Sequence, residues 1–489
     1  MSTSSAPTNP PGPTAATGPS TGPSRPVRRW LVLAICCLSV GVTGINLTIV
    51  NVALPSISRD LHASLSSLEW TVSTYSLVMA CLLMLSGSMA DRFGRKRIFQ
   101  LGLTLFSLGS LLCGLAPGVG WLIAFVGVQA VGGSMLNPVA MSIIVGVFTD
   151  RGERARAIGV WGSVIGITMA AGPVLGGLLV SGIGWRSVFW ISVPIGIAAF
   201  ALTRKFVPES KATRARRFDP FGQALIIVLF ASIIAATIEG PRHGWTDPWI
   251  VGLIVLAVVA LTGILVVEPR RSEPLIDLRY FRSPPFSGAN LISLMMTAGL
   301  GGFLFLNTLY LQDIRGYSPL HAGVMIIPMA LGQAVAANLS GRLVAARRDR
   351  LALALGGALL ATGAFPLVAL STHTHSVHLL VAYAVFGLGA GMVSPPVSHT
   401  AVSGMPLDQV GVAGALAASA RQFGSAIGVA VTGSIVASSS AGFVHSSHAA
   451  WVVIGGCGVA VLALGLISTS SWARDAATRN GQRLVTHDH

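Results

Sequence analysis

The segment GSMADRFGRKR at residues 87–97 ends an apolar run with one acidic residue and a cluster of basic residues. A second segment, GRLVAARRDR at 341–350, has the same layout, with glycine first and basic residues last. Apolar runs of roughly 20 residues flank both segments, long enough to cross a bilayer as helices. Repetition of one layout in two halves of a hydrophobic chain is typical of secondary transporters.

Lipid is the solvent that this composition suits. Hydrophobic residues make up 52% of the 489-residue chain and charged residues only 10%. In lipid the backbone must satisfy its own hydrogen bonds, so we expect helices; the alternation that a membrane β-barrel needs is not seen. Fourteen spans are expected, near residues 31–53, 68–88, 98–116, 121–147, 157–181, 187–205, 221–239, 249–267, 286–312, 320–343, 351–370, 377–402, 411–437 and 450–470.

The order of these spans predicts the domain organisation. The expected fold class is an all-α membrane protein of two six-helix bundles with an inserted two-helix hairpin. The expected divisions are a disordered tail at 1–27, a first bundle at 28–206, a linker with two extra helices at 207–285, a second bundle at 286–470 and a second tail at 471–489.

The positive charge of the chain, formally +15, is distributed unevenly. Of its 32 Lys and Arg residues, 27 fall in alternate loops and the tails on one side of the expected membrane. This bias places those loops and both termini in the cytoplasm of a multi-pass protein of the inner (plasma) membrane. It also argues against a nucleic-acid surface, which gathers its charge on one folded face.

The loops are short and leave no room for a soluble catalytic or nucleotide-binding domain. All five cysteines fall within spans, and no metal-binding motif is found. No cluster of buried acid, base and nucleophile is expected either. We therefore expect neither an enzyme nor a protein that uses a cofactor or a metal.

The loop at 87–97 carries the most specific motif of the chain, formed by Gly87, Asp91, Arg92, Gly94, Arg95 and Lys96. Further matching stretches are TIVNVALP at 48–55, GWRSVF at 184–189, YLQ at 310–312, GYSPLHAG at 316–323 and RQFG at 421–424. With these motifs the chain resembles the major facilitator superfamily, specifically its fourteen-span drug:proton antiporters. The resemblance implies that the 87–97 loop is a conformational latch. The alternative is a basic loop that sets topology and carries a solvated Asp91.

A second motif, in the fifth span, resembles one associated with antiporters. It consists of Gly159, Gly172, Pro173, Gly176 and Gly177. Proline interrupts the helical hydrogen-bond ladder and glycine permits close helix contact, so this span is expected to bend and shape a gate. Ordinary packing of small residues is the alternative.

The chain departs from the resembled family at two positions that usually carry charge. Asn46 stands where the family has Asp in the first span, and Val126 stands where it has Arg in the fourth, although Gln129 is preserved. Because a charge inside the membrane is costly, such partners tend to be kept or lost together. The expected cavity is therefore neutral and polar, and it favours neutral or anionic amphiphiles over lipophilic cations.

Other polar residues are candidates for this cavity or for proton coupling. The amides are Asn51, Gln129, Asn137, Asn307, Gln333 and Asn338, for which bonding between helices is an equal alternative. The candidate proton carriers are Asp91, Glu69, Glu239, Asp313 and His399, although carboxylates at helix ends are usually solvated. Arg421, inside the thirteenth span, either binds an anionic group or is a structural tie.

The function expected is export of small amphipathic compounds such as drugs or antibiotics, driven by the proton gradient through alternating access. The alternatives are an uncoupled facilitator or uptake carrier, and a membrane sensor that keeps the fold without transport. The expected partners are a small-molecule substrate, protons and the lipid bilayer, with no nucleic acid, and the chain is expected to act as a monomer.

Overall fold

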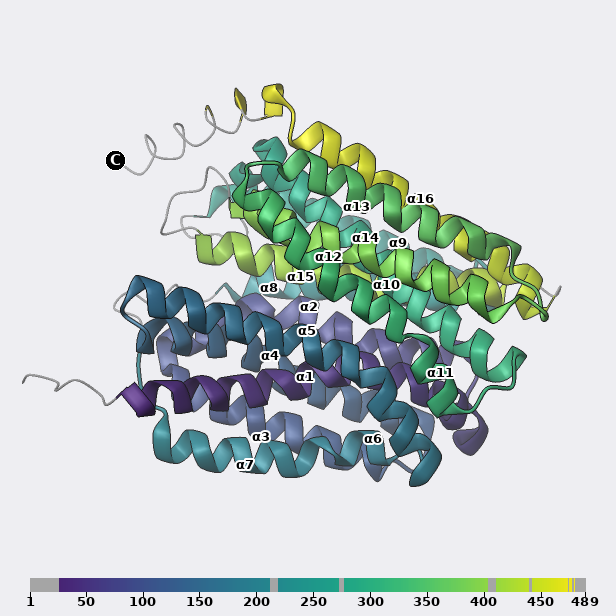
Figure 1. The fold of residues 1–489 in the computed structure, drawn as a ribbon, viewed down its shortest axis with the longest axis horizontal. Helices are drawn as coiled ribbons and strands as arrows, with labels where there is room; N and C mark the ends of the chain where they lie inside the picture. Colours follow the sequence, from purple (N-terminus) through teal and green to yellow (C-terminus); the bar gives the residue numbers. More distant parts are fainter. Residues whose placement is uncertain are drawn as a thin grey trace, which may run out of the picture.

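The computed structural model describes residues 26–211, 219–271, 277–402, 410–438, 442–473, 475–476 and 479. Across these residues the chain is helical and has no strands (Figure 1). Thirteen of its helical segments are long and apolar enough to cross a membrane, and α15 (Val410–Ala437) is a further long helix. The tail expected at 1–27 and most of that expected at 471–489 lie outside the described residues.

The first group of helices runs from Pro26 to Phe206. It consists of α1 (Pro26–Leu61), α2 (Leu65–Phe93), α3 (Arg95–Gly114), α4 (Val119–Val147), α5 (Arg151–Gly182), α6 (Ser187–Trp190) and α7 (Ser192–Phe206). Helices α6 and α7 together make one span. Within this group α1 packs on α5, α4 packs on α2 and α3, and α7 packs on α3.

The second group follows two further helices, α8 (Pro220–His243) and α9 (Pro248–Val267), and the short turns η1 (Glu268–Arg270) and η2 (Leu278–Arg282). The second group consists of α10 (Pro284–Leu309), the π-helical turn η3 (Tyr310–Ile314), α11 (Pro319–Met325), α12 (Ile327–Ala345), α13 (Asp349–Ala364), η4 (Phe365–Ala369), α14 (Ser376–Val402), α15 and α16 (Phe443–Ser468). Its contacts mirror those of the first group, with α10 on α15 and α16, and α14 on α12 and α13.

The two ends of the bundle differ, and we name them by the chain. The end at which α1 begins and α16 ends is the terminal end, and the opposite one is the distal end (Figure 1). The N-terminal group fills the lower half of the view and the C-terminal group the upper half. The 87–97 segment, expected as a loop, is the end of α2 and the start of α3, joined by Gly94 alone at the terminal end, whereas the α5–α6 connection lies at the distal end.

The inserted hairpin lies on the seam between the two groups. Helix α2 of the first group packs against α15 of the second, and α8 packs against both of them. Leu77 and Cys81 of α2, Ile234 and Ile238 of α8 and Ala426 of α15 share one apolar cluster. Helix α9 packs on α8 and leaves most of its apolar surface exposed, as a lipid-facing helix does.

All fourteen expected spans coincide with helical segments, which confirms the fold class. The structure differs from the prediction where single spans are broken. The span expected at 320–343 is two helices, α11 and α12, and that at 351–370 ends in the 3₁₀ turn η4. Pro328 and Pro366 lie in the first turns of α12 and η4. Proline has no N–H to donate to a preceding turn and therefore begins a new helical segment.

Candidate functional site

The loop after α2 has a backbone conformation that requires glycine. Gly94 has φ = +113°, a region that other residues rarely adopt. A Cβ on Gly94 would lie 2.7 Å from Oε1 of Glu209, so the carboxylate packs directly on the glycine. The same Oε1 accepts a hydrogen bond from the backbone N–H of Lys96 at 3.1 Å. Glu209, which the sequence did not single out, thereby holds the start of α3.

The charged residues of the 87–97 segment bond to other residues of the N-terminal group. Asp91, whose side chain is 36% exposed, pairs with Arg95 at 3.2 Å. The ammonium of Lys96 donates to the carbonyl oxygen of Arg204 at 2.9 Å. Gly87 has open space where a side chain would be. Arg92 lies beside its neighbour Phe93. In this conformation the loop is thus tied to the segment after α7.

The glycines of the fifth span divide into two kinds. Gly172 and Gly176 pack against Thr48 and Ile49 of α1, so that α5 and α1 approach closely. Gly177 instead faces the second group: a Cβ there would lie 2.6 Å from the Cα of Leu320 in α11. Gly159, at the other end of the helix, has open space around it.

The contact between α5 and α11 is reciprocal. A Cβ on Gly323 of α11 would overlap the carbonyl oxygen of Pro173, in the same way that one on Gly177 would overlap Leu320. A third link between the groups is the hydrogen bond from Nε2 of Gln312, in η3, to the carbonyl oxygen of Val52 at 2.9 Å. These contacts close the distal end between the two groups.

Toward the terminal end, few residues of α5 are buried. Its buried residues are Gly172, Pro173, Gly176, Gly177 and Val180 in the distal half, with only Ala157 in the other half. The two groups therefore meet along α5 at the distal end, and α5 is mostly exposed toward the terminal end. Figure 1 shows the same arrangement, with α11 reaching the lower group on the distal side.

Asn46, one of the two residues at usually charged positions, forms an amide pair with the preserved Gln129. Asn46 and Gln129 exchange two hydrogen bonds of 3.2 Å between α1 and α4, and Gln129 also donates to the hydroxyl of Ser110 at 2.7 Å. All three residues are buried, and so is Val126. The donors and acceptors of Asn46 and Gln129 thus bond one helix to another.

The remaining amide candidates are distributed over several helices. Asn307 accepts a hydrogen bond from the hydroxyl of Tyr383, and Asn51 donates to the carbonyl oxygen of Leu47. The other side-chain atoms, Nδ2 of Asn307 and Oδ1 of Asn51, are buried without a partner among the described residues, as is Oδ1 of Asn137. Gln333 and Asn338 lie on α12, partly exposed and exposed respectively.

Arg421 lies one turn before Gly424 on α15. Gly424 and Gly428 pack against the backbone of α10, at Leu294 and Ala298. Arg421 is partly exposed, and no hydrogen bond or ion pair joins it to another part of the chain that the structure describes. Both alternatives given for Arg421, an anion-binding group and a structural tie, therefore stay predictions.

The ionisable candidates lie at the two ends of the bundle. Asp313 is exposed at the distal end, within electrostatic reach of Arg59. His399 is exposed at the terminal end and pairs with Asp349 at 3.1 Å. Glu239 accepts a hydrogen bond from the indole N–H of Trp70 at 2.8 Å.

Glu69 departs most from its expected environment. It was expected at an outer span end as a candidate proton carrier, and the structure shows it 0% exposed on α2, facing α15. Burial depends on which helix lies opposite, and the glycine that makes room for it, Gly433, is 364 residues away in the chain. The sequence signal available was a carboxylate placed next to Trp70 inside an otherwise apolar span.

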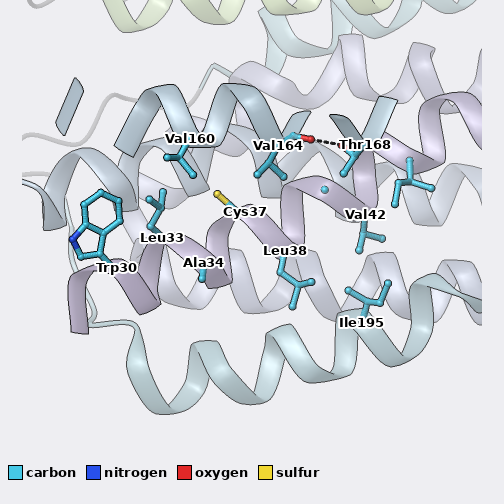
Figure 2. A pocket seen from close by; sticks show the side chains of 12 residues that line it. Trp30, Leu33, Ala34, Cys37, Leu38, Val42, Val160, Val164, Thr168 and Ile195 are labelled. Atoms are coloured by element: carbon cyan, nitrogen blue, oxygen red, sulfur yellow. Dashed lines mark hydrogen bonds between the residues drawn. The ribbon is translucent and has the colours of Figure 1, made fainter. Parts of the chain in front are cut away.

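The structure also contains an apolar groove of about 520 Å³ between α1, α5 and α7. Figure 2 shows Trp30 at one end and Thr168 toward the other, with aliphatic side chains between them. The hydroxyl of Thr168 is already bonded to the carbonyl oxygen of Val164. A site for amphipathic molecules needs polar groups that orient the ligand, which this groove does not offer.

Comparison with known proteins identifies the family. Residues 36–429 match the sequence model of the Major Facilitator Superfamily. The chain is 36% identical over 413 residues to the multidrug resistance protein Stp of Mycobacterium tuberculosis, covering 84% of this chain and 77% of that protein. The chain belongs to the major facilitator superfamily. It is therefore a multi-pass membrane transporter rather than an enzyme.

Two further likenesses agree with this membership. The chain is 34% identical to the tetracenomycin C resistance and export protein of Streptomyces glaucescens, over 84% of this chain and 76% of that protein. The solved structure of a peptide transporter, POT in complex with sulfate, superposes with a TM-score of 0.64 at 18% identity, covering 92% of this chain and 95% of that one. At that identity the likeness concerns the fold alone.

The glycine of the 87–97 loop gives a first prediction. Replacing Gly94 with Ala forces a Cβ into a positive-φ position and against Glu209, at a cost of about 1–3 kcal/mol for the backbone alone. We expect the purified Gly94→Ala protein to unfold at a lower temperature than the unmodified chain. Gly87→Ala is the control, because open space surrounds that residue. Equal melting temperatures for the two variants would contradict the packing described.

The α5–α11 contact gives a second prediction. A valine at Gly177 pushes Leu320 away, so we expect Gly177→Val to lengthen the distance between spin labels at the exposed distal residues Ser181 and Thr372. Gly162→Val, on the same helix but in open space, is the control and leaves the distance unchanged. If both variants give the same spin-label distance as the unmodified chain, the α5–α11 contact does not close the distal end.

Proposed function

We propose that this transporter exports small amphipathic compounds, and that the proton gradient drives it through alternating access. The observation that carries the proposal is the unequal contact between the two helix groups. Gly177 and Gly323 seal the distal end, while α5 is uncovered toward the terminal end. A carrier with a site between two bundles passes through such a state. Relatives named for drug resistance and for export support the direction of transport.

The orientation follows from the distribution of positive charge. The basic loop at 87–97 and the segment after α7 lie at the terminal end, where the excess of Lys and Arg is found. The positive-inside rule places that end in the cytoplasm of a plasma-membrane protein. The structure is then the inward-facing state, in which the site is open to the cytoplasm and closed to the outside.

The 87–97 loop has a role in this cycle that its contacts support. In the inward-facing state Asp91 is bonded to Arg95, and Glu209 holds the start of α3. We infer that the residues 28–206 and 286–470 rock as two bodies and that Asp91 meets the second body when the terminal end closes. The loop then acts as a latch that is open in this structure.

The substrate class follows from the polar groups at the centre. Asn46 and Val126 stand where the resembled family carries charge, and Asn46 and Gln129 pair as neutral amides, so the α1–α4 contact carries no charge. The buried carboxyl of Glu69 lies in the seam with α15 and not at the α1–α4 contact. We therefore propose neutral or anionic amphiphiles as the preferred substrates, with Arg421 available to an anionic group.

Drug accumulation in a pump-deficient bacterial host tests the function. Cells that express the chain are expected to accumulate less of a neutral or anionic amphiphile than cells with an empty vector, and a protonophore abolishes the difference. A panel that adds cationic dyes tests the substrate preference. The transport is expected to fall in Gly177→Val, which disturbs the distal seal, and to persist in Gly162→Val.

The outcomes separate the proposal from its alternatives. Compounds that move down their gradient, with no effect of the protonophore, would identify an uncoupled facilitator. Unchanged accumulation of every compound, with the protein present in the membrane, would favour a sensor that does not transport. Selective export of cations would contradict the substrate preference while leaving the export function in place.

A further inference from the structure

A carboxyl group is sealed inside the seam between the two helix groups. Glu69, the fifth residue of α2, is fully buried, and neither of its carboxylate oxygens has a hydrogen-bond partner among the described residues. Gly433 of α15 makes room for it, since a Cβ at that position would lie 2.7 Å from Cγ of Glu69. One turn further along, the hydroxyl of Ser73 donates to the carbonyl oxygen of Ala426 at 3.3 Å, so the seam around the carboxyl is tight.

This environment accepts only the neutral acid. An ionised carboxylate that is buried without a cation or hydrogen-bond donors loses its hydration and gains nothing in return. A neutral carboxyl pays only the smaller cost of a buried polar group. The closed seam therefore requires that Glu69 carries a proton. The ionised form of Glu69 requires contact with water, and for water to reach the carboxylate α2 and α15 must separate at the distal end.

A path of ionisable groups leads from this carboxyl to the distal surface. Glu239 of α8 lies within electrostatic reach of Glu69 and accepts a hydrogen bond from the indole of Trp70 at 2.8 Å. Its side chain is 17% exposed and lies 3.6 Å from Nδ1 of His243, which is 40% exposed. Helix α8 of the inserted hairpin thus places these ionisable groups beside the seam.

The other helices around Glu69 supply no counter-charge to it. Helix α4 carries no ionisable residue along its length. The only charged residue in α15 is Arg421, twelve positions before Gly433 and hence about 18 Å away along the helix. In α1, Asp60 is paired with Arg186, and Arg59 is bonded to its own helix. The charges of α3 lie at its terminal end.

We propose that Glu69 is a proton-operated switch for the distal end of the transporter. The distal seam between α2 and α15 closes with Glu69 protonated and opens with Glu69 ionised, and Glu239 and His243 connect the residue to distal water. The switch itself stands on the geometry of the seam, and its link to export rests on the proposed function. In that cycle a proton taken up from the outside closes the emptied carrier toward the state of this structure.

Distances across the seam, measured as a function of pH, test the proposal. Spin labels at the exposed distal residues Ser64 and Ser438, before α2 and after α15, report on the purified full chain in nanodiscs. A short distance is expected at low pH, with a longer population appearing as the pH rises. Glu69→Gln is expected to keep the short distance at every pH, because the amide is neutral. His373→Asn, which removes an exposed titratable group at the distal end, is expected to keep the pH response.

Two further variants distinguish loss of the switch from general damage to the protein. Glu69→Asp retains an acid and is expected to retain the pH response. Gly433→Ala pushes a Cβ into the carboxyl and is expected to enrich the longer distance even at low pH. A pH response in Glu69→Gln equal to that of the unmodified chain overturns the proposal, and so does an unmodified chain whose distances ignore pH.

The accumulation assay separates this inference from the proposed function. Export that a protonophore abolishes, together with distances that ignore pH, would leave the function standing and remove the switch. If the distance across the seam depends on pH, loses that dependence in Glu69→Gln, and no compound is exported, the switch stands and the proposed function does not.

Discussion

No hydrophobic effect draws two helices together inside a lipid bilayer, because the lipid chains are as apolar as the side chains. Association depends instead on close van der Waals contact, which requires residues without bulk at the crossing points. The chain contains 57 glycines, and its most consequential contacts use them. Gly177 and Gly323 bring the backbones of α5 and α11 together between the two groups, and Gly433 makes room for Glu69.

Contacts of this kind define the geometry of the distal end. A Cβ on Gly177 or Gly323 would overlap the backbone of the opposite helix, so neither position accepts a side chain unless α5 and α11 move apart. The buried residues of α5 lie mainly in its distal half, whereas the helices within each group pack extensively on one another.

A second constraint acts on polar groups inside the bundle, because a charge buried there without a partner is costly. Asn46, Gln129 and Ser110 satisfy one another in the N-terminal group. Glu69 violates this constraint unless it carries a proton, because its oxygens are buried and unpaired in the described residues. A group that must be neutral in one state and is free to ionise in another makes the equilibrium between those states depend on pH.

The sequence predicted the spans because hydropathy over about 20 residues reports membrane depth directly. It did not predict the break between α11 and α12, although Pro328 marks it, because a proline near a span end is compatible with an unbroken helix. It found the residues of the fifth-span motif but not their separate partners, since α1 and α11 lie opposite different faces of α5. Hydropathy gives the depth of a residue and not its neighbour, which is why the sequence placed Glu69 at a span end but did not predict that α15 buries it.

The position of the hairpin explains why the two sides of the molecule open differently. On one side α2 and α15 remain packed well beyond the distal end, where Met84 of α2 joins Ala413 and Leu416 of α15 in an apolar cluster. Helix α8 covers this seam, and Nε2 of Gln223 donates to the carbonyl oxygen of Cys81 at 2.7 Å. On the other side no such helix covers α5, and its terminal half is exposed. The hairpin that carries Glu239 to Glu69 therefore covers the seam between α2 and α15, while α5 on the other side has most of its terminal half exposed in the described residues.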